Sequence, residues 1–211
     1  MRQNPSFAMT DAAELRRVIE ANPWATLVAA TSDGVVASHY PVLLADDRDD
    51  LTVVGHVGRP DDMLLDLGRS ELTVIIQGPH GYISPSWYEP APAVPTWNFV
   101  AIHLSGVAEG MPDDENLRTL ERLVARFESL LPEPRTMWSP PNDPEYVHRL
   151  AAGTVGFRLT PTRVVAKRKL SQNRPAADVD RIIDRLEADG PFAQPDLAAE
   201  MRRARDARRP R

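Results

Sequence analysis

Residues 25–40 read ATLVAATSDGVVASHY, and this stretch decides the predicted architecture. Two β-favouring runs, Ala25 to Ala30 and Val35 to Tyr40, are separated by Ser32-Asp33-Gly34. A short Ser, Asp and Gly link between such runs is typical of a β-hairpin, because Gly adopts the positive φ angles that tight turns need. The stretch therefore predicts two antiparallel strands joined by a tight turn.

Further strands and helices follow at short intervals. Helical spacing of apolar residues predicts helices that begin near Asp11, Asp61, Asp113, Pro144 and Asp178. Strands and helices do not alternate regularly, so we predict a mainly β fold with peripheral helices, an antiparallel barrel rather than a doubly wound sheet. The further predicted strands are Leu51 to Val57, Leu72 to Gln77, Trp97 to Val107, and a pair formed by Thr154 to Thr160 with Arg163 to Lys169.

The longest predicted helix begins at Asp113 and ends before Pro132. Proline lacks a backbone N–H and cannot continue a helix, which sets the end of this one. Apolar side chains at helical spacing are expected to form its buried side: Leu117, Leu120, Val124, Phe127 and Leu131.

The composition limits the classes of protein to which the chain can belong. Its 211 residues, of which 42% are hydrophobic, suffice for one substantial core. We therefore predict a single domain over residues 1–190, followed by a helical or flexible basic tail over residues 191–211. The lack of cysteine excludes disulfides, thiolate metal sites and cysteine nucleophiles. No apolar run approaches the roughly 20 residues of a membrane helix, so we predict a soluble, cytoplasmic protein that does not enter a membrane.

The net charge of −5 is unevenly distributed along the chain. Residues 201–211 hold six arginines and one aspartate, so the remainder is clearly acidic. This basic end can be interpreted as a nucleic-acid-binding arm or as a solvated, fraying helix. We favour the solvated helix, because charge runs at chain ends usually face water. The sequence does not decide whether the protein binds DNA directly.

Three segments combine aromatic, hydroxyl, amide and cationic side chains between Pro or Gly residues. They read GPHGYISPSWY at residues 78–88, VPTWNF at residues 94–99 and KLSQNR at residues 169–174. We expect the first segment to be a loop stiffened by its Pro and Gly residues. Trp97 offers a stacking face and Asn98 a paired donor and acceptor, which suit a planar heteroaromatic ligand or an interface equally well.

The third segment has the most specific chemistry of the three. Cations supply charge for a phosphate group, and hydroxyl or amide donors fix its geometry, so the segment predicts a phosphate site. The alternative is a solvated strand end that caps the following helix. The polar residues concerned are Lys167, Arg168, Lys169, Ser171, Gln172, Asn173 and Arg174.

Five histidines are present, but their spacing does not match a metal site. We therefore predict no bound metal. His39 in SHYP and His56 in GHV lie near predicted strand ends, where a side chain can turn toward a pocket. Ligand contact and structural hydrogen bonding explain both positions equally well. No residue stands out as a general acid or base, so we assign no catalytic residue.

In the order of six motifs, the chain resembles the PaiB family of FMN-binding negative transcriptional regulators. The resemblance extends from Asn4-Pro5 to KLSQNR. It implies a split β-barrel related to flavin reductases and pyridoxamine phosphate oxidases, usually a homodimer with FMN bound at the subunit interface. The motifs are ASHYP (37–41), GHV (55–57), QGPHGYISPSWY (77–88), VPTWNF (94–99), VGFRL (155–159) and AKRKLSQNR (166–174).

This resemblance implies FMN as the cofactor, since the split barrel provides one phosphate site and the chain has no dinucleotide fingerprint. One departure concerns residues 57–62, VGRPDD, where Asp61 replaces the Asn that the family typically has. If that position touches the flavin, a carboxylate there disfavours an anionic phosphate or reduced flavin. The predicted cofactor-binding residues are Ser38, His39, His56, Trp97, Asn98, Lys169, Ser171, Gln172 and Asn173.

Two functions from different classes remain. The resemblance implies a negative transcriptional regulator that acts directly or indirectly, although no helix-turn-helix pattern accompanies the basic tail. The alternative is a flavin-dependent oxidoreductase acting on a small molecule, in which FMN supplies the redox chemistry and the protein supplies binding and orientation. A third reading is a different planar cofactor, such as a deazaflavin or haem.

Overall fold

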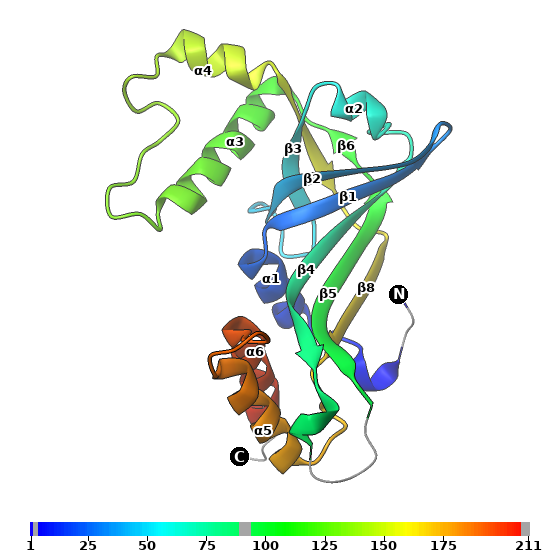
Figure 1. The fold of residues 1–211 in the computed structure, drawn as a ribbon. Helices are drawn as coiled ribbons and strands as arrows, with labels where there is room; N and C mark the ends of the chain where they lie inside the picture. Colours follow the sequence, from blue (N-terminus) through cyan, green and yellow to red (C-terminus); the bar gives the residue numbers. More distant parts are fainter. Residues whose placement is uncertain (2–3, 89–93, 208–211) are drawn as a thin grey trace. The chain divides into compact units, whose positions relative to one another are not determined.

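The structure, a computed structural model, describes residues 1, 4–88 and 94–207. Its strands form one sheet in the order β6-β7-β3-β2-β1-β4-β5-β8 (Figure 1). The pairs of β1 with β2 and β4, of β3 with β2 and β7, and of β6 with β7 are all antiparallel. The strands are β1 (Trp24–Thr31), β2 (Gly34–Leu44), β3 (Val53–Gly58), β4 (Glu71–Ile83), β5 (Thr96–Val107), β6 (Glu109–Gly110), β7 (Thr154–Leu159) and β8 (Arg163–Lys169).

Helices occur before, between and after these strands. The prediction of a mainly antiparallel β fold with helices is therefore confirmed. The α-helices are α1 (Ala12–Ala21), α2 (Asp61–Leu64), α3 (Asp113–Glu128), α4 (Pro144–Ala151), α5 (Ala176–Glu187) and α6 (Pro195–Asp206), and the 3₁₀ helices are η1 (Pro5–Phe7) and η2 (Pro85–Trp87).

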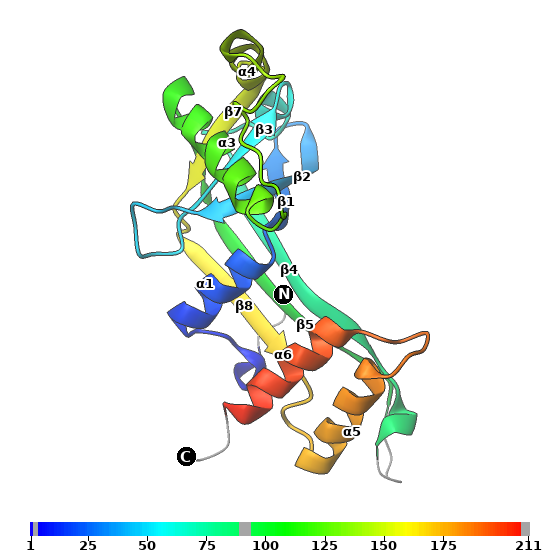
Figure 2. The same ribbon diagram turned by 90° about the vertical axis from the view of Figure 1, so that its left-hand side faces the viewer.

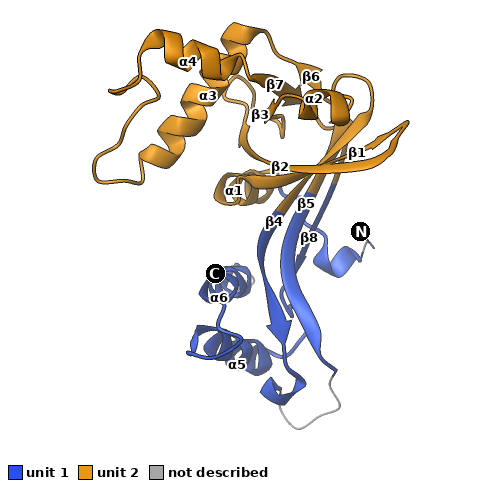
Figure 3. Cartoon of the chain, turned by 45° about the horizontal axis from the view of Figure 1, so that its top comes forward, with its two compact units in different colours: residues 1–11, 77–102, 165–211 blue, residues 12–76, 103–164 orange. Residues whose placement is uncertain are grey.

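The chain divides into two compact units, which Figure 3 distinguishes by colour. Unit 1 comprises Met1–Asp11, Gln77–Ile102 and Val165–Arg211. Unit 2 comprises Ala12–Ile76 and His103–Val164. The single domain over residues 1–190 stays a prediction. The described part of the predicted tail belongs to unit 1, together with the KLSQNR segment.

The predicted hairpin is present in unit 2. Strands β1 and β2 pair from Trp24 with Pro41 to Thr31 with Gly34, which leaves Ser32 and Asp33 as a two-residue turn. Gly34 has a φ of 122°, a backbone conformation that disfavours residues with a Cβ. Side chains of a strand alternate between its two faces, and one face of β1 is fully buried: Ala25, Leu27 and Ala29.

Two amphipathic helices bury the sides that their spacing predicts. In unit 2, α1 buries its apolar side chains, and in unit 1, α5 does the same. Both predictions are confirmed, because in each helix the apolar residues recur three and four positions apart. The buried residues are Leu15, Val18 and Ile19 in α1, and Asp178, Val179, Ile182, Ile183 and Leu186 in α5.

The predicted buried side of α3 is wrong. The helix buries Asn116, Thr119 and Leu123, whereas Phe127 is 42% exposed. Asn116 Nδ2 donates a hydrogen bond to Thr154 Oγ1 at 2.9 Å, and a Cβ on Gly156 would lie 2.9 Å from the Asn116 side chain. The bare backbone of Gly156 and this hydrogen bond therefore bring this side of α3 against β7, although Asn116 Oδ1 is buried without a partner among the described residues.

The prediction that β7 and β8 pair with each other is wrong, although both strands are present. Strand β7 pairs with β3 and β6, and β8 is the neighbour of β5. The connection after β7 packs against the end of β5, where Thr162 N donates to the carbonyl of Ser105 at 2.9 Å. A Cβ on Gly106 would lie 2.9 Å from the Thr160 carbonyl oxygen. This close approach directs the chain to β5 instead of back along β7.

The prediction of a loop over residues 78–88 is wrong in its first half, because β4 continues to Ile83. The glycines of this segment permit close packing instead of breaking the strand. A Cβ on Gly78 would lie 3.1 Å from Val100 Cβ, and one on Gly81 would lie 3.0 Å from Leu197 Cδ2. Only after Ile83 does the chain leave the strand and form η2.

Helix α6 packs against α5, so the prediction of a solvated helix is wrong for its described residues. Met201 is 1% exposed, and Arg202 donates to the Glu187 carboxylate of α5 at 2.8 Å. Arg205 pairs with Asp180 of the same helix. Helices α5 and α6 lie side by side in both ribbon views (Figures 1 and 2). Residues 208–211 of the predicted tail lie outside the described residues.

Candidate functional site

The segment Lys169–Arg174 in unit 1 forms a tight turn that its own side chains close. Gln172 Oε1 accepts from the Leu170 backbone N–H at 2.6 Å, and Gln172 Nε2 donates to the Arg168 carbonyl at 2.6 Å. Ser171 has a φ of 58°, which is left-handed and strained for a residue with a Cβ. The amide of Gln172 therefore holds the backbone of the turn in one shape.

Two predicted site residues, Asn98 and Ser171, form a buried pair in unit 1. They are 0% and 3% exposed. Asn98 Nδ2 donates to Ser171 Oγ at 2.9 Å and to the sulfur of Met201 at 3.4 Å, and the Ser171 hydroxyl lies 3.2 Å from Asn98 Oδ1. This pair connects the start of β5 with the turn, so its polar atoms are satisfied inside unit 1.

Lys169 is the predicted site residue with the strongest charge. Its Nζ donates to the Trp97 carbonyl at 2.8 Å and to the Thr96 hydroxyl. Burial lowers the pKa of the Lys169 amine, and the positive charge of nearby Lys167 lowers it further. The amine is held by two neutral oxygens and no carboxylate in these contacts, so an anionic ligand would gain from its charge.

The end of the turn faces water and adds a second cation. Asn173 and Arg174 are both exposed. The Arg174 guanidinium carbon lies 4.6 Å from the centre of the Tyr88 ring, in a cation–π contact. The turn thus presents one amide and one guanidinium to solvent next to the amine of Lys169.

A second group of polar side chains lies in unit 2, around Asp61. Asp61 Oδ2 accepts from Ser38 Oγ at 2.6 Å and from Tyr40 Oη at 3.0 Å. Tyr40 Oη in turn accepts from the Gly58 backbone N–H at 3.0 Å. Burial raises the pKa of the Tyr40 hydroxyl, and Asp61 raises it further against the opposing effect of Gly58. The hydroxyl therefore keeps its proton and donates it to the carboxylate.

His56 of β3 completes this second group. Its ring centre lies 6.0 Å from that of Tyr40, in an edge-on arrangement. Burial lowers the pKa of the imidazole, so His56 is neutral at neutral pH. Its Nδ1 is buried and has no hydrogen-bond partner among the described residues. Because such an orphaned atom costs free energy, it fits a site that a polar ligand completes.

His39 does not join this group. It precedes Tyr40 on β2, so its side chain points to the opposite face from Ser38 and Tyr40. The His39 ring is exposed and stacks on that of Trp24, with 6.4 Å between the ring centres. The structure therefore brings Ser38 and His56 together and leaves His39 apart from them.

Tyr40 is a residue of this group that our sequence reasoning missed. The available signal was the period of two along β2, which places Tyr40 on the same face as Ser38. Asp61, which we identified only as a departure from the family pattern, is the acceptor that joins them.

Trp97 lies in a different setting from Asn98, its neighbour in the sequence. Its ring is 54% exposed and stacks on that of His80, with 6.3 Å between centres and an interplanar angle of 25°. It also meets the Tyr82 ring edge-on at 6.4 Å. These rings line a pocket of about 510 Å³ in unit 1, here called the aromatic pocket, which consists of His80, Gly81, Tyr82, Ser84, Trp97, Pro191, Phe192 and Gln194.

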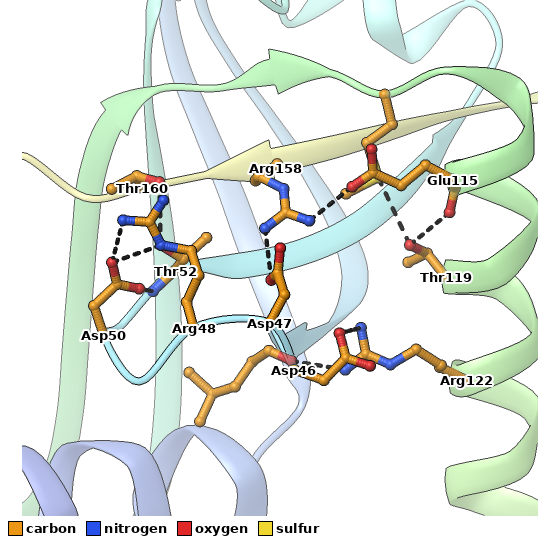
Figure 4. A network of polar contacts seen from close by, with 12 residues as sticks. Asp46, Asp47, Arg48, Asp50, Thr52, Glu115, Thr119, Arg122, Arg158 and Thr160 are labelled. Carbon is orange, nitrogen blue, oxygen red and sulfur yellow. Dashed lines mark hydrogen bonds and ion pairs between the residues drawn. The ribbon is translucent and has the colours of Figure 1, made fainter.

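A charged pocket of about 590 Å³ lies in unit 2 (Figure 4). Arg158 donates to Asp47 at 2.9 Å and to Glu115 at 2.7 Å, and Arg122 pairs with Asp46 at 3.1 Å. Since each of its arginines is paired with a carboxylate, this network offers less for a phosphate than the turn at Lys169. The lining consists of Asp46, Asp47, Arg48, Val54, Glu115, Arg118, Thr119, Arg122 and Arg158.

Two kinds of feature are absent from the described residues, a metal-binding cluster and a membrane-spanning helix. No cluster of three or more His, Asp or Glu side chains suited to a metal ion occurs there. None of the helices described is both long enough and apolar enough to span a bilayer.

Comparisons with known proteins give the family. A family model described as "Putative FMN-binding domain" matches residues 1–163. The chain is 31% identical over 183 residues to "Protease synthase and sporulation protein PAI 2" of Bacillus subtilis (strain 168), which covers 86% of each chain. FMN, the cofactor that we predicted, is the one that the family description names, so this prediction is confirmed.

Two solved structures share the fold. The FAD and heme binding protein from Mycobacterium smegmatis has a TM-score of 0.57 at 17% identity, over 82% of this chain and 78% of that one. The flavocytochrome Anf3 from Azotobacter vinelandii has a TM-score of 0.60 at 13% identity, over 85% of this chain and 78% of that one. Both likenesses confirm the predicted split-barrel fold of flavin-binding proteins. The family model and the Bacillus relative together show that this chain is a flavin-binding protein that belongs to the PaiB-type family of FMN-binding domains.

Proposed function

We propose that this flavin-binding protein is a negative regulator of transcription that acts indirectly, through its bound FMN, and does not itself read a DNA sequence. The observation that carries this proposal is a contrast between the polar groups that could hold a ligand and the basic residues of α6 that could contact DNA. The groups at Lys169 and His56 are shaped for a ligand, whereas two arginines of α6 are bound to carboxylates of α5. A cytoplasmic location and a homodimer are part of the same proposal.

We assign separate tasks to the two polar groups. In unit 1, Lys169 neutralises the phosphate, with Asn173 and Arg174 as further donors, because charge-assisted hydrogen bonds are the strong ones. Asn98, Ser171 and Gln172 keep the turn in shape and act as positioning residues. In unit 2, Ser38 and the neutral His56 offer hydrogen bonds to the polar edge of a ring. Bound FMN supplies the capacity to accept and return electrons.

Asp61 makes this assignment testable. Replacing Asp61 by Asn is expected to tighten FMN binding roughly fivefold, which corresponds to about 1 kcal/mol of binding free energy. The reason is that the change removes a negative charge from the group that contains Ser38 and His56. The fold should change little, since the Asn carbonyl can still accept from Ser38 and Tyr40. Titration of the apoprotein with FMN, followed by flavin fluorescence, measures the effect.

The control for Asp61→Asn is Asp33→Asn, which removes one negative charge from the exposed turn of the hairpin. Its affinity for FMN should equal that of the wild type. Equal affinities for all three proteins would place Asp61 outside the cofactor site, and the assignment of Ser38 would then fail as well.

A homodimer would cover apolar surface that the described chain leaves exposed. The end of α3 and the turn after it expose Phe127, Leu130 and Leu131. Neighbouring exposed apolar side chains of this kind are typical of surfaces that another protein covers.

The indirect route has a direct test with DNA. Protein loaded with FMN is expected to give no sequence-selective footprint on promoters whose transcripts rise in a deletion strain. Deleting residues 208–211 should leave FMN affinity unchanged, because this deletion spares the packed helix α6. Truncation after Glu200 is a poorer test, because it removes the buried Met201. A selective footprint that the deletion abolishes would refute the indirect route.

The regulatory role itself is tested in the same deletion strain. Wild-type protein should restore repression, and Lys169→Ala should not. Equal repression by both proteins would show that the flavin has no part in regulation.

A flavin-dependent oxidoreductase is the second candidate, and one observation favours it. Tyr40 keeps its proton and lies beside the neutral His56, so this group could give a proton to a reduced substrate. Mixing the loaded protein with NADH or NADPH in the absence of air discriminates the candidates. Rapid bleaching of the flavin absorbance, followed by turnover with an added acceptor, would favour the enzyme.

A further inference from the structure

The aromatic pocket owes its shape to Gly81 of β4. A Cβ at this position would lie 3.0 Å from Leu197 Cδ2 and 3.2 Å from Gln194 Cγ. The missing side chain lets the start of α6 lie close to the strand. The backbone N–H of Gln194 also donates to the Leu186 carbonyl of α5 at 2.8 Å, which fixes the wall that carries Phe192.

Half of the residues that line the pocket carry an aromatic ring. Phe192 lies 5.1 Å from Tyr82 and 6.2 Å from Trp87, measured between ring centres. On the other side, Trp97 stacks on His80. Phe192 is 45% exposed and Trp97 is 54% exposed, so two large rings leave apolar faces open to water at one concave place. Covering such faces releases free energy in proportion to the apolar area buried.

Among the residues that the structure describes, none that lines this pocket is Asp, Glu, Lys or Arg. This distinguishes it from the charged pocket in unit 2, which is lined mainly by Asp, Glu and Arg. An ionised ligand would lose its hydration in the aromatic pocket without gaining a counter-charge from the lining. The lining therefore favours a ligand without net charge.

A few polar groups are available within the lining. The Tyr82 hydroxyl and the Gln194 amide have no hydrogen-bond partner among the described residues. His80 Nδ1 lies 3.1 Å from the Gly78 carbonyl oxygen and 3.2 Å from Gln77 Nε2, so this ring nitrogen already has polar neighbours within β4. A ligand edge with both a donor and an acceptor would match this set.

We propose that the aromatic pocket is a second ligand site of this protein, which binds an uncharged, planar aromatic molecule with a hydrogen-bonding edge. The site adjoins the cationic turn that we assign to the phosphate of FMN, because Trp97 lines the pocket and its carbonyl accepts from Lys169 Nζ. Its volume of about 510 Å³ falls within the range of roughly 300 to 1,000 Å³ that is usual for small-molecule sites.

The test uses 2-quinolinone, an uncharged bicyclic ring with an amide edge, on protein labelled with 5-fluorotryptophan. The chain has four tryptophans, which Trp→Phe variants assign in the fluorine NMR spectrum. The signal of Trp97 should shift saturably, with a dissociation constant on the order of 0.1 to 1 mM for so small a ligand. The signals of Trp24 and Trp138, both in unit 2, should stay in place.

Phe192→Ala should weaken 2-quinolinone binding at least tenfold. The matched control is Phe127→Ala, because Phe127 in unit 2 is exposed to almost the same extent, 42% against 45%. It should leave binding unchanged. Since Phe192 is half exposed, its variant is expected to fold, and a thermal unfolding curve checks this.

Four outcomes would overturn the proposal. The first is that the Trp97 signal shows no saturable shift up to the solubility limit of 2-quinolinone, and the second is that both Phe variants bind it equally. The third is that the anion 2-naphthalenesulfonate binds as tightly as 2-quinolinone or more tightly. The fourth is that Phe192→Ala loses as much affinity for FMN as for 2-quinolinone. The last would identify the pocket as the flavin ring site. If the wild type binds 2-quinolinone at Trp97 but takes up no FMN, the proposed function fails and the second site stands.

Discussion

Replacing Lys169 by alanine is expected to weaken FMN binding roughly ten- to a hundred-fold. A hydrogen bond to a charged group contributes about 1.5 to 3 kcal/mol, and each 1.4 kcal/mol changes a dissociation constant tenfold. Lys169 Nζ is held by the Trp97 carbonyl and the Thr96 hydroxyl, so the amine is already in place for an anionic ligand. Titration of the apoprotein with FMN, followed by flavin fluorescence, gives the two dissociation constants.

The same substitution should change the stability of the apoprotein little. Lys169 is only half-buried, and water can replace its two hydrogen bonds. Arg185→Ala is the control, because it removes one exposed positive charge from α5 in the same unit and leaves the turn intact. If both variants weaken FMN binding equally, the loss of affinity reflects the change in net charge and not a contact of Lys169 with the phosphate. If Lys169→Ala lowers the thermal midpoint without changing affinity, the turn is only a strand end.

The elements that the sequence predicted well are those whose pattern is local. The hairpin of β1 and β2 needs only a period of two and a turn at Ser32 and Asp33, and α1 needs only its apolar spacing. In both, the residues that determine the element lie within one stretch, so no distant contact can change the outcome.

The wrong predictions concern elements whose structure depends on a residue that is distant in the sequence. Gly78 and Gly81 suggested a loop, but they serve close packing against Val100 and Leu197, which no local pattern reveals. The buried side of α3 depends on Gly156, some forty residues away. In each case a tertiary contact, and not the local sequence pattern, determined the structure.

Some residues of the candidate site could likewise be found from a local pattern, and others could not. Lys169 could be identified from its charge and its neighbours, since phosphate chemistry needs cations and donors together. Tyr40 could not be identified in this way, because its role depends on Asp61 and Gly58, which follow about twenty residues later. Asn98 and Ser171 were predicted to bind the cofactor, and this stays a prediction. Their burial, and hence their role in holding the turn, required the fold.

His56→Leu is expected to change stability and cofactor affinity in opposite directions. In the wild type, the buried Nδ1 has no partner among the described residues, and such an atom costs about 1 to 3 kcal/mol. An apolar side chain of similar volume removes this cost. The free energy of unfolding of the apoprotein should therefore rise by about 1 kcal/mol, as measured by urea denaturation.

The affinity for FMN should fall roughly tenfold in the same variant, because the leucine cannot make the hydrogen bond that the ring edge offers to Nδ1. His39→Leu is the matched control. It makes the same chemical change one strand away, on an exposed ring that stacks on Trp24, and should alter neither quantity by much. A stabilised His56→Leu protein with unchanged affinity would mean that the orphaned atom serves no ligand. A destabilised one would mean that bound water already satisfies Nδ1, and His56 would then be a structural residue of β3.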